Sequence, residues 1–488
     1  MSEVIPASTA PEPRVNRNAG WMAASQGWSL LLSITSAMVL ARLLTPEDFG
    51  ILAMAAPLIG FAHQVQAMGF TSSIIQAPRL DKRQLDAPFW LSFGVSLLMT
   101  SLVIIAAPLI SRLLHDPRLS AVLIVCALSI IVTTLAAQPT AILSRNLRFR
   151  AIAKRNIAAT TIATLVSIGI AAATHSYWAL VVSMILVPLI NFVASASLVR
   201  WRPGLPRRNS GAGAMIGFGL NLSGANLLNF ASRNADNLII AYATSPQQLG
   251  IYDRAYRMLL YPINQALLPL GEVLIPTLSR SIDDPASYRR HYWRAVLLLL
   301  FLCLPGLVVA VIFPETVIGM LLGPRWLEGA PLFGWFAAAG LFQIYLGTTN
   351  WLLISQGRGG DYLRVMLFGS VVALASFLVG IGWGIRGVAV AYVLGQAIIC
   401  LPFQLWIVGR EGHIRLREIA LRLVPHCAAL ALVSFMLAAC RWQFGTPGLA
   451  MLIAEVVAAY TAYGLVLVLS PAYRQLMMGV AQKRAFGT

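Results

Sequence analysis

Long apolar runs recur along the whole chain and leave few folds open to it. The sequence of 488 residues is 58% hydrophobic and only 11% charged, a composition that a water-soluble domain does not accommodate. Each run is roughly 20 residues long, the length at which a helix crosses a bilayer. The runs lack β-barrel alternation, so helices are the remaining way to satisfy the backbone in lipid. The sequence predicts an all-α integral membrane protein.

About fourteen runs qualify as transmembrane helices. The run at 213–243 is the longest and is expected to tilt or to extend beyond the hydrocarbon. We place the fourteen spans at residues 21–43, 49–72, 87–110, 119–142, 152–173, 177–199, 213–243, 256–279, 294–313, 329–355, 362–383, 386–408, 419–440 and 447–469.

The distribution of basic residues supports this number of spans. With the N-terminus in the cytoplasm, 27 of the 36 Lys and Arg residues fall in cytoplasmic segments, 8 fall on the opposite side, and Arg233 lies within a span. Cytoplasmic loops of membrane proteins carry such an excess. The net charge of +18 is therefore explained by topology rather than by nucleic-acid binding. Both termini are expected in the cytoplasm.

A short phrase occurs twice, 200 positions apart. Residues 45–51 read TPEDFGI and residues 245–251 read SPQQLGI, each after a long apolar run, which indicates a duplicated helix–turn–helix corner. Six spans separate the copies, so both run in the same direction, and the repeat is parallel. Two pseudo-symmetric six-helix bundles and two additional helices follow from it. The expected organisation is a disordered cytoplasmic tail (1–19), an N-lobe (20–208), a C-lobe (209–410) and a C-terminal helix pair with a cytoplasmic tail (411–488).

Polar residues follow one face of the first and seventh spans at equivalent depth. Spacings of three and four residues place each set on a single helical face. A polar face should not meet lipid, so it either lines a water-filled path or packs against another helix. We take these residues as candidates for a substrate path: Ser29, Ser33 and Ser36 in the first span, and Asn226, Asn229, Arg233 and Asn237 in the seventh.

Charged groups within or near the membrane have two interpretations each. Arg233 can bind an anionic substrate group, or it can be neutralised by Asp236 three residues later. Asp236 and Glu272 are candidates for ion coupling, because a buried carboxylate can bind a proton near neutral pH. Glu455 lies outside the two lobes and is a weaker candidate. Three further arginines near the outer ends of spans either join the path or extend to the interface: Arg42, Arg254 and Arg257.

Other chemical sites are not indicated. The five cysteines lie in apolar runs without metal-ligand spacing, and no stretch has the GxxxxGK[ST] spacing of an ATP-binding loop. We therefore expect no metal and no cofactor, with energy from an ion gradient or from removal of product. No loop is long enough to form a catalytic domain, which counts against a membrane-embedded sugar polymerase or ligase.

Three phrases resemble a known family. They are Gly20–Trp21 with residues 41–50 (ARLLTPEDFG), residues 144–150 (SRNLRFR), and residues 218–221 (FGLN) with 232–237 (SRNADN). Together they look like the Wzx-type polysaccharide transporters of the lipopolysaccharide and exopolysaccharide exporter branch. That branch belongs to the superfamily that includes multidrug exporters and lipid-linked sugar flippases.

The resemblance implies a fold and an activity. The fold is a V of two six-helix bundles around a central cavity, and the extra C-terminal pair resembles one that lines a lipid-tail groove in a related flippase. The implied activity moves undecaprenyl-pyrophosphate-linked oligosaccharide across the bacterial inner membrane by alternating access. A polysaccharide polymerase and co-polymerase are the implied partners, and the chain is expected to be monomeric. A drug–cation antiporter of the same fold remains an alternative, because the spans contain more acids than arginines.

Overall fold

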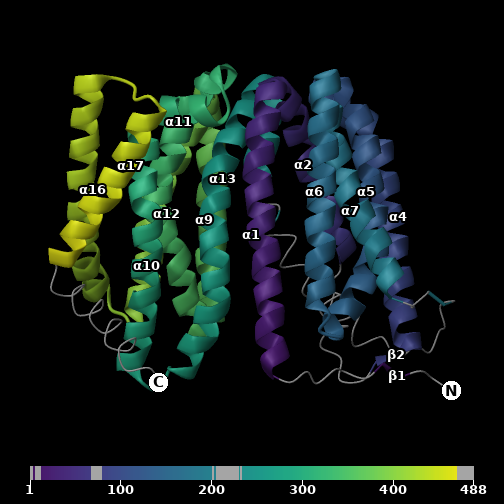
Figure 1. Cartoon of the computed structure of the whole chain (residues 1–488), viewed down its shortest axis with the longest axis horizontal. Helices are drawn as coiled ribbons and strands as arrows, with labels where there is room; N and C mark the ends of the chain where they lie inside the picture. Colours follow the sequence, from purple (N-terminus) through teal and green to yellow (C-terminus); the bar gives the residue numbers. More distant parts are fainter. Residues whose placement is uncertain are drawn as a thin grey trace. The chain divides into compact units, whose positions relative to one another are not determined.

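The structure, a computed structural model, describes residues 4–5, 12–67, 80–199, 203–204, 230 and 234–469. It confirms the all-α fold class, with helices throughout these ranges (Figure 1). The exception is one antiparallel pair of two-residue strands, β1 (Val4–Ile5) and β2 (Leu80–Asp81). The chain forms two compact units, Met1–Gly250 and Ile251–Thr488.

Six helices make up most of the described part of the first unit. Helix α5 is central and packs against α2, α4 and α7, while α6 packs against α1 and α7. The buried face of α5 includes Leu119, Val122, Cys126 and Ile130, which recur at the spacing of one helical face. The helices are α1 (Glu12–Leu43), α2 (Pro46–Ala67), α4 (Lys82–Leu113), α5 (Arg118–Arg145), α6 (Phe149–Thr174) and α7 (Trp178–Leu198).

The second unit is built around α10, which packs against α12 and against the C-terminal pair α16 and α17 (Figure 1). Helix α9 begins in the first unit and continues into the second. The elements are α9 (Pro246–Arg280), α10 (Pro285–Ile312), α11 (Pro314–Leu321), η1 (Pro324–Gly329), α12 (Ala330–Ser355), α13 (Gly359–Gly380), η2 (Ile381–Trp383), α14 (Gly384–Leu394), η3 (Gly395–Cys400), α15 (Leu401–Arg410), α16 (Leu416–Phe444) and α17 (Leu449–Leu469).

Most of the predicted spans have a counterpart. Within the described ranges, eleven helical stretches are long and apolar enough to cross a membrane, and the stretch Gly359–Arg410 contains the two spans predicted at 362–383 and 386–408. Helix α9 covers the span at 256–279. The span at 213–243 lies mostly outside the described residues, so the total of fourteen stays a prediction.

The structure adds three details to the sequence prediction. Helix α1 starts at Glu12 and includes part of the expected disordered tail. The connection after α10 forms the short helices α11 and η1. The span at 386–408 is interrupted by the π-helical turn η3. This turn ends two residues before Pro402, whose missing N–H and ring disturb the regular ladder of the preceding turn.

The duplicated phrase starts a helix in both places, which confirms the predicted corner. Thr45 Oγ1 accepts from the Asp48 amide (3.3 Å), and Asp48 Oδ2 accepts from the Thr45 amide (2.8 Å), which forms a capping box. In the second copy Ser245 Oγ accepts from the Gln248 amide (3.3 Å). Proline follows each cap at the first helical position, where its fixed φ suits a helix start.

The two copies also contact each other inside the first unit, which includes residues 246–250. A Cβ on Gly50 would clash with the carbonyl oxygen of Pro246, and a Cβ on Gly250 would clash with the carbonyl oxygen of Pro46. Small residues let helix backbones approach this closely. The glycine shared by both copies is therefore a packing requirement.

Successive helices run in opposite directions, so their connections alternate between the two ends of each unit. At one end of the first unit, Arg148 donates to the Leu198 carbonyl (3.2 Å). At the other end, His175 Nδ1 lies 3.2 Å from the Leu43 carbonyl oxygen. In the second unit, Arg289 donates to the His413 carbonyl (2.7 Å), again joining two loops predicted to be cytoplasmic. These contacts place the basic loops of each unit together.

Candidate functional site

The predicted path in the seventh span is described only in part. Asn226, Asn229 and Arg233 lie outside the described residues. Asp236 and Asn237 follow in the described helix, with exposed fractions of 3% and 5%. Both side chains are thus sheltered, as polar groups in a spanning helix should be. Their role in a substrate path stays a prediction.

The serine face of α1 has two environments. At the N-terminal end of this face, the buried Ser25 Oγ lies 3.5 Å from the Ala153 carbonyl oxygen on α6. Ser29 and Ser36 are half-buried, and Ser33 is exposed. Helix packing therefore accounts for Ser25. The other three retain the accessibility that a path requires.

The remaining candidate residues lie on α1 and α9. Arg42 and Arg257 are exposed, and Arg254 is half-buried. Both carboxylate oxygens of Asp253 accept from Arg257 Nε at 2.8 Å, one turn apart on α9. Glu272 is exposed on α9. Arg254, Arg257 and Glu272 all lie on α9, and the proposed roles of Glu272 and the three arginines stay predictions.

Glu455 differs from the other acids. It is buried on α17, and neither carboxylate oxygen has a hydrogen-bond partner among the described residues. On the same helix pair, His426 of α16 and Tyr463 of α17 share a hydrogen bond. A buried carboxyl without a partner is costly when ionised, which makes Glu455 a candidate for carrying a proton.

A second duplicated corner, which the sequence analysis missed, joins α5 to α6 and α12 to α13. Asn146, Leu147 and Arg148 bond back to the carbonyls of residues 142, 144 and 143, and residues 356–358 bond back to 352, 354 and 353. Leu147 and Gly357 both have a left-handed backbone, with φ of 52° and 69°. The offset is 210 positions, compared with 200 for the first phrase.

Each corner presents an arginine to the end of a later helix. Arg148 donates to the Leu198 carbonyl at the end of α7. Arg358 donates to the Ile407 carbonyl near the end of α15 and to the Glu411 carbonyl, both at 2.6 Å. Cations are favoured at helix C-termini, where the last carbonyls lack intrahelical partners. The shared signal in the sequence is an arginine that directly precedes each following helix.

The two corners differ in charge. Asp361 forms ion pairs with Arg358 (2.8 Å), Arg364 (3.1 Å) and Arg410 (3.5 Å). The matching position in the first unit is Ala151, and the corner there contains only basic charges: Arg145, Arg148, Arg150, Lys154 and Arg155. Buried Arg155 is instead held by neutral oxygens, including Thr140 Oγ1 at 2.7 Å.

Comparison with known proteins decides the family. Residues 39–331, more than half of the chain, match the family described as polysaccharide biosynthesis protein. The chain belongs to this family. Among curated members of related sequence, the lipopolysaccharide biosynthesis protein WzxC of Escherichia coli (strain K12) is 22% identical over 387 residues, which cover 78% of each chain.

Solved structures show the fold of this polysaccharide biosynthesis protein. The lipid II flippase MurJ, in an inward closed conformation, aligns with a TM-score of 0.73 and 14% identity over 93% of this chain and 99% of MurJ. An inward-facing multidrug resistance MATE family transporter aligns with a TM-score of 0.61 and 16% identity over 78% and 94% of the two chains. The chain therefore has the fold of these transporters and is a multi-pass membrane protein.

Proposed function

We propose that this family member is a flippase. It moves undecaprenyl-pyrophosphate-linked oligosaccharide repeat units from the inner to the outer leaflet of the bacterial inner membrane, by alternating access around a polar path. The units then serve the assembly of exopolysaccharide, O-antigen or capsule. The observation that carries the proposal is the family match over residues 39–331 in a chain with the MurJ fold.

The physical chemistry of the substrate supports this function. A pyrophosphate and several sugars cannot enter hydrocarbon, because burying charges and unpaired hydroxyls costs too much free energy. Asn side chains can bond sugar hydroxyls, and an Arg can bind phosphate as a bidentate donor. The sequence pattern predicts one helical face with these groups: Asn226, Asn229, Arg233 and Asn237.

The proposed transport needs no cofactor. The sequence lacks the ATP-binding spacing, so energy comes from an ion gradient or from consumption of the product outside. Asp236 and Glu272 are the proposed coupling groups. The protein is proposed to be a transporter without catalytic activity, because its short loops offer no catalytic domain.

The proposed cellular setting follows from the charge bias. Both termini lie in the cytoplasm, and the protein acts as a monomer, because one chain contains both copies of the repeat. A polysaccharide polymerase and a co-polymerase use the translocated unit on the outer side.

A deletion strain tests the proposal. Surface polysaccharide and lipid-linked intermediate are measured after complementation with wild type, Arg233→Ala, Arg233→Lys or Asp236→Asn. Wild type should restore polysaccharide, Arg233→Ala should leave intermediate in the inner leaflet, and Arg233→Lys should restore part of the transport. Unchanged polysaccharide in a strain without a redundant flippase would overturn the proposal.

A multidrug antiporter is the second candidate, and the fold shared with the MATE transporter favours it. It predicts that deletion sensitises cells to cationic drugs, that Asp236 or Glu272 is indispensable, and that Arg233 is not. A membrane sugar polymerase or ligase predicts instead that the purified protein converts lipid-linked sugar in detergent.

A further inference from the structure

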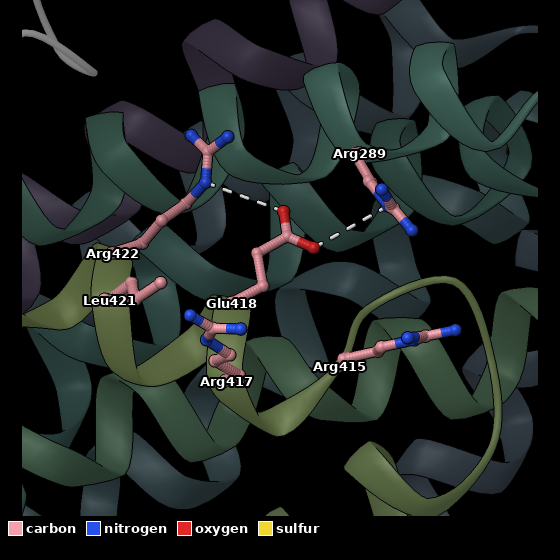
Figure 2. Close-up of a pocket in the computed structure, with 6 residues that line it drawn as sticks. All are labelled: Arg289, Arg415, Arg417, Glu418, Leu421 and Arg422. Atoms are coloured by element: carbon pink, nitrogen blue, oxygen red, sulfur yellow. Dashed lines mark ion pairs between the residues drawn. The ribbon is translucent and has the colours of Figure 1, made fainter.

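A basic pocket lies where α10 and α16 begin, within the second unit. Its volume is about 760 Å³, and its lining residues are Arg289, Arg415, Arg417, Glu418, Leu421 and Arg422 (Figure 2). Four arginines face one glutamate, so the lining carries a net charge of +3. The family match ends at residue 331, before most of this pocket. None of these residues belongs to the polar stripes.

A rigid framework holds two of the arginines. Glu418 lies between them (Figure 2), with its carboxylate 3.6 Å from Arg289 and 3.6 Å from Arg422. Trp293, which is fully buried, donates its Nε1–H to Glu418 at 2.8 Å. The Arg422 guanidinium also lies 5.2 Å from the centre of the Trp293 ring. Helix α10 thus fixes the position of the first turns of α16.

The other two arginines are not compensated. Arg415 and Arg417 are exposed, and no carboxylate pairs with either of them in the part of the chain that the structure describes. One glutamate cannot neutralise four guanidinium groups, and it already serves Arg289 and Arg422. The surplus positive charge is therefore concentrated at Arg415 and Arg417.

The start of α16 adds further donors. Arg415 occupies the cap position and makes no side-chain cap hydrogen bond. By contrast, the neighbouring α10 carries its own anion, because Asp284 accepts from the amides of Ala286 (3.0 Å) and Ser287 (3.1 Å). The first amides of a helix lack intrahelical partners and attract anions. At α16 that place is open to an external anion beside the arginine cluster.

An apolar face leads away from the pocket along α16. It starts at Leu421 in the lining, which is 63% exposed, and continues through Val424, Leu432 and Phe435, which are 60%, 49% and 75% exposed. Steps of three, eight and three residues keep these side chains on one side of the helix. In a membrane-spanning helix, such a face meets lipid chains.

We propose that this pocket binds the phosphate head group of an anionic phospholipid from the surrounding membrane. Arg415, Arg417 and the first amides of α16 bind the phosphate, Arg289 and Arg422 border it, and an acyl chain lies on the face from Leu421 to Phe435. The charge bias assigns this end to the cytoplasmic surface, where anionic lipid head groups bind basic pockets between helices. The ligand is a lipid of the bilayer and differs from the proposed translocated substrate.

The test uses purified full-length protein in mixed micelles. Bound lipid is counted by native mass spectrometry during titration with phosphatidylglycerol or with phosphatidylcholine. The double variant Arg415→Gln/Arg417→Gln should bind phosphatidylglycerol about 30-fold more weakly, because each basic residue contributes roughly fivefold near an anionic surface. Phosphatidylcholine binding should not change.

A matched control separates a site from general charge. Arg325 and Arg386 are exposed arginines of the same unit, and Arg325→Gln/Arg386→Gln removes the same charge. This control should bind phosphatidylglycerol like wild type. Equal losses in the two double variants would overturn the proposal, and so would wild-type binding in Arg415→Gln/Arg417→Gln or equal affinity for the two lipids.

Competition identifies the source of the phosphate. Inorganic pyrophosphate or a polyprenyl pyrophosphate is added to the complex with phosphatidylglycerol. Retention of the phospholipid at equimolar competitor supports the proposal. Displacement by polyprenyl pyrophosphate would assign the pocket to the sugar carrier, and displacement by inorganic pyrophosphate would assign it to a free anion. Either displacement would reject a phospholipid site, and neither result depends on transport activity.

Discussion

The corners α5–α6 and α12–α13 have the same backbone hydrogen bonds, but only the second contains a carboxylate among its arginines. In both, an arginine follows a left-handed residue and bonds to carbonyls at the end of a later helix. In the second unit, Asp361 then pairs with three arginines. In the first unit, Ala151 takes that place, and the cluster has no acid at this position.

The difference shows that the shared part of the corner is the bond from arginine to carbonyl. The backbone hydrogen bonds and the arginine recur with the same register, while the carboxylate is an addition of one copy. An ion pair is therefore not needed to form the corner. It links α13 to α15 in the second unit, whereas the corresponding stretch of the first unit, residues 145–155, contains no carboxylate.

Asp361→Asn should have the largest effect on this comparison. Arg358, whose side chain is only 12% exposed, would lose its carboxylate, and breaking a sheltered pair costs about 3 kcal/mol. The unfolding temperature of the purified protein in detergent should fall clearly. Asp283→Asn, at an exposed position without an ion pair among the described residues, should leave it unchanged. An unaltered unfolding temperature in Asp361→Asn would show that the network contributes nothing.

Arg358→Gln and Arg148→Gln should differ in the same assay. Arg358→Gln removes bonds to three backbone carbonyls, one side-chain amide and one carboxylate and should cost about 2 kcal/mol. Arg148→Gln removes a single bond at an exposed side chain and should cost less than about 1 kcal/mol. Equal losses would mean that Asp361 adds no stability to the second corner.

Gly357→Ala should cost about 1 kcal/mol, because its φ of 69° is unfavourable for a residue with a Cβ. No atom lies within 4 Å of the added Cβ, so the loss measures backbone strain alone. Gly360→Ala, in a helix with equally open surroundings, is the control and should not destabilise. If both variants keep the wild-type unfolding temperature, the left-handed corner does not require glycine.

Ala151→Asp should have the smallest effect. It places a carboxylate three residues after Arg148, which copies the spacing of Arg358 and Asp361. An exposed helical pair contributes roughly 0.3 kcal/mol, so the unfolding temperature should rise slightly at low salt and return to wild type at high salt. Ala151→Asn carries no charge and should show no salt-dependent gain. A gain in both variants would rule out charge compensation as its cause.

The fold could be predicted well from the sequence, because the length of the apolar runs and the distribution of Lys and Arg depend directly on where helices span the membrane. The phrase at 45–51 and 245–251 was recognisable because helix capping favours particular residues. These are Thr or Ser at the cap, Pro directly after it, and a side chain with a hydrogen-bond acceptor three residues after the cap. The corner at 146–148 and 356–358 was missed for the opposite reason. Its left-handed residue is Leu in one copy and Gly in the other, so the shared conformation leaves little trace in the sequence.

The site was less predictable. Periodicity predicted that Asp236 and Asn237 share a polar face that avoids lipid. Both side chains are buried, and their place in a substrate path stays a prediction. The basic pocket depends on Trp293 and Glu418, which are 125 positions apart. A contact of that range follows from how α10 and α16 pack, and no local pattern encodes it. The sequence showed basic loops at both places without indicating that they form one pocket.

The contact between Gly50 and Gly250 has a consequence for the origin of the chain. Gly50 lies against the carbonyl of Pro246, and Gly250 lies against the carbonyl of Pro46. Each copy therefore contributes one glycine and one carbonyl to the contact. This reciprocity is the rule for a twofold interface between identical subunits. A single ancestral copy of the motif would have carried both halves of the contact and could have paired with itself before gene fusion. Each glycine therefore stays under the constraint that the carbonyl of the other copy imposes, while neighbouring positions such as Phe49 and Leu249 differ.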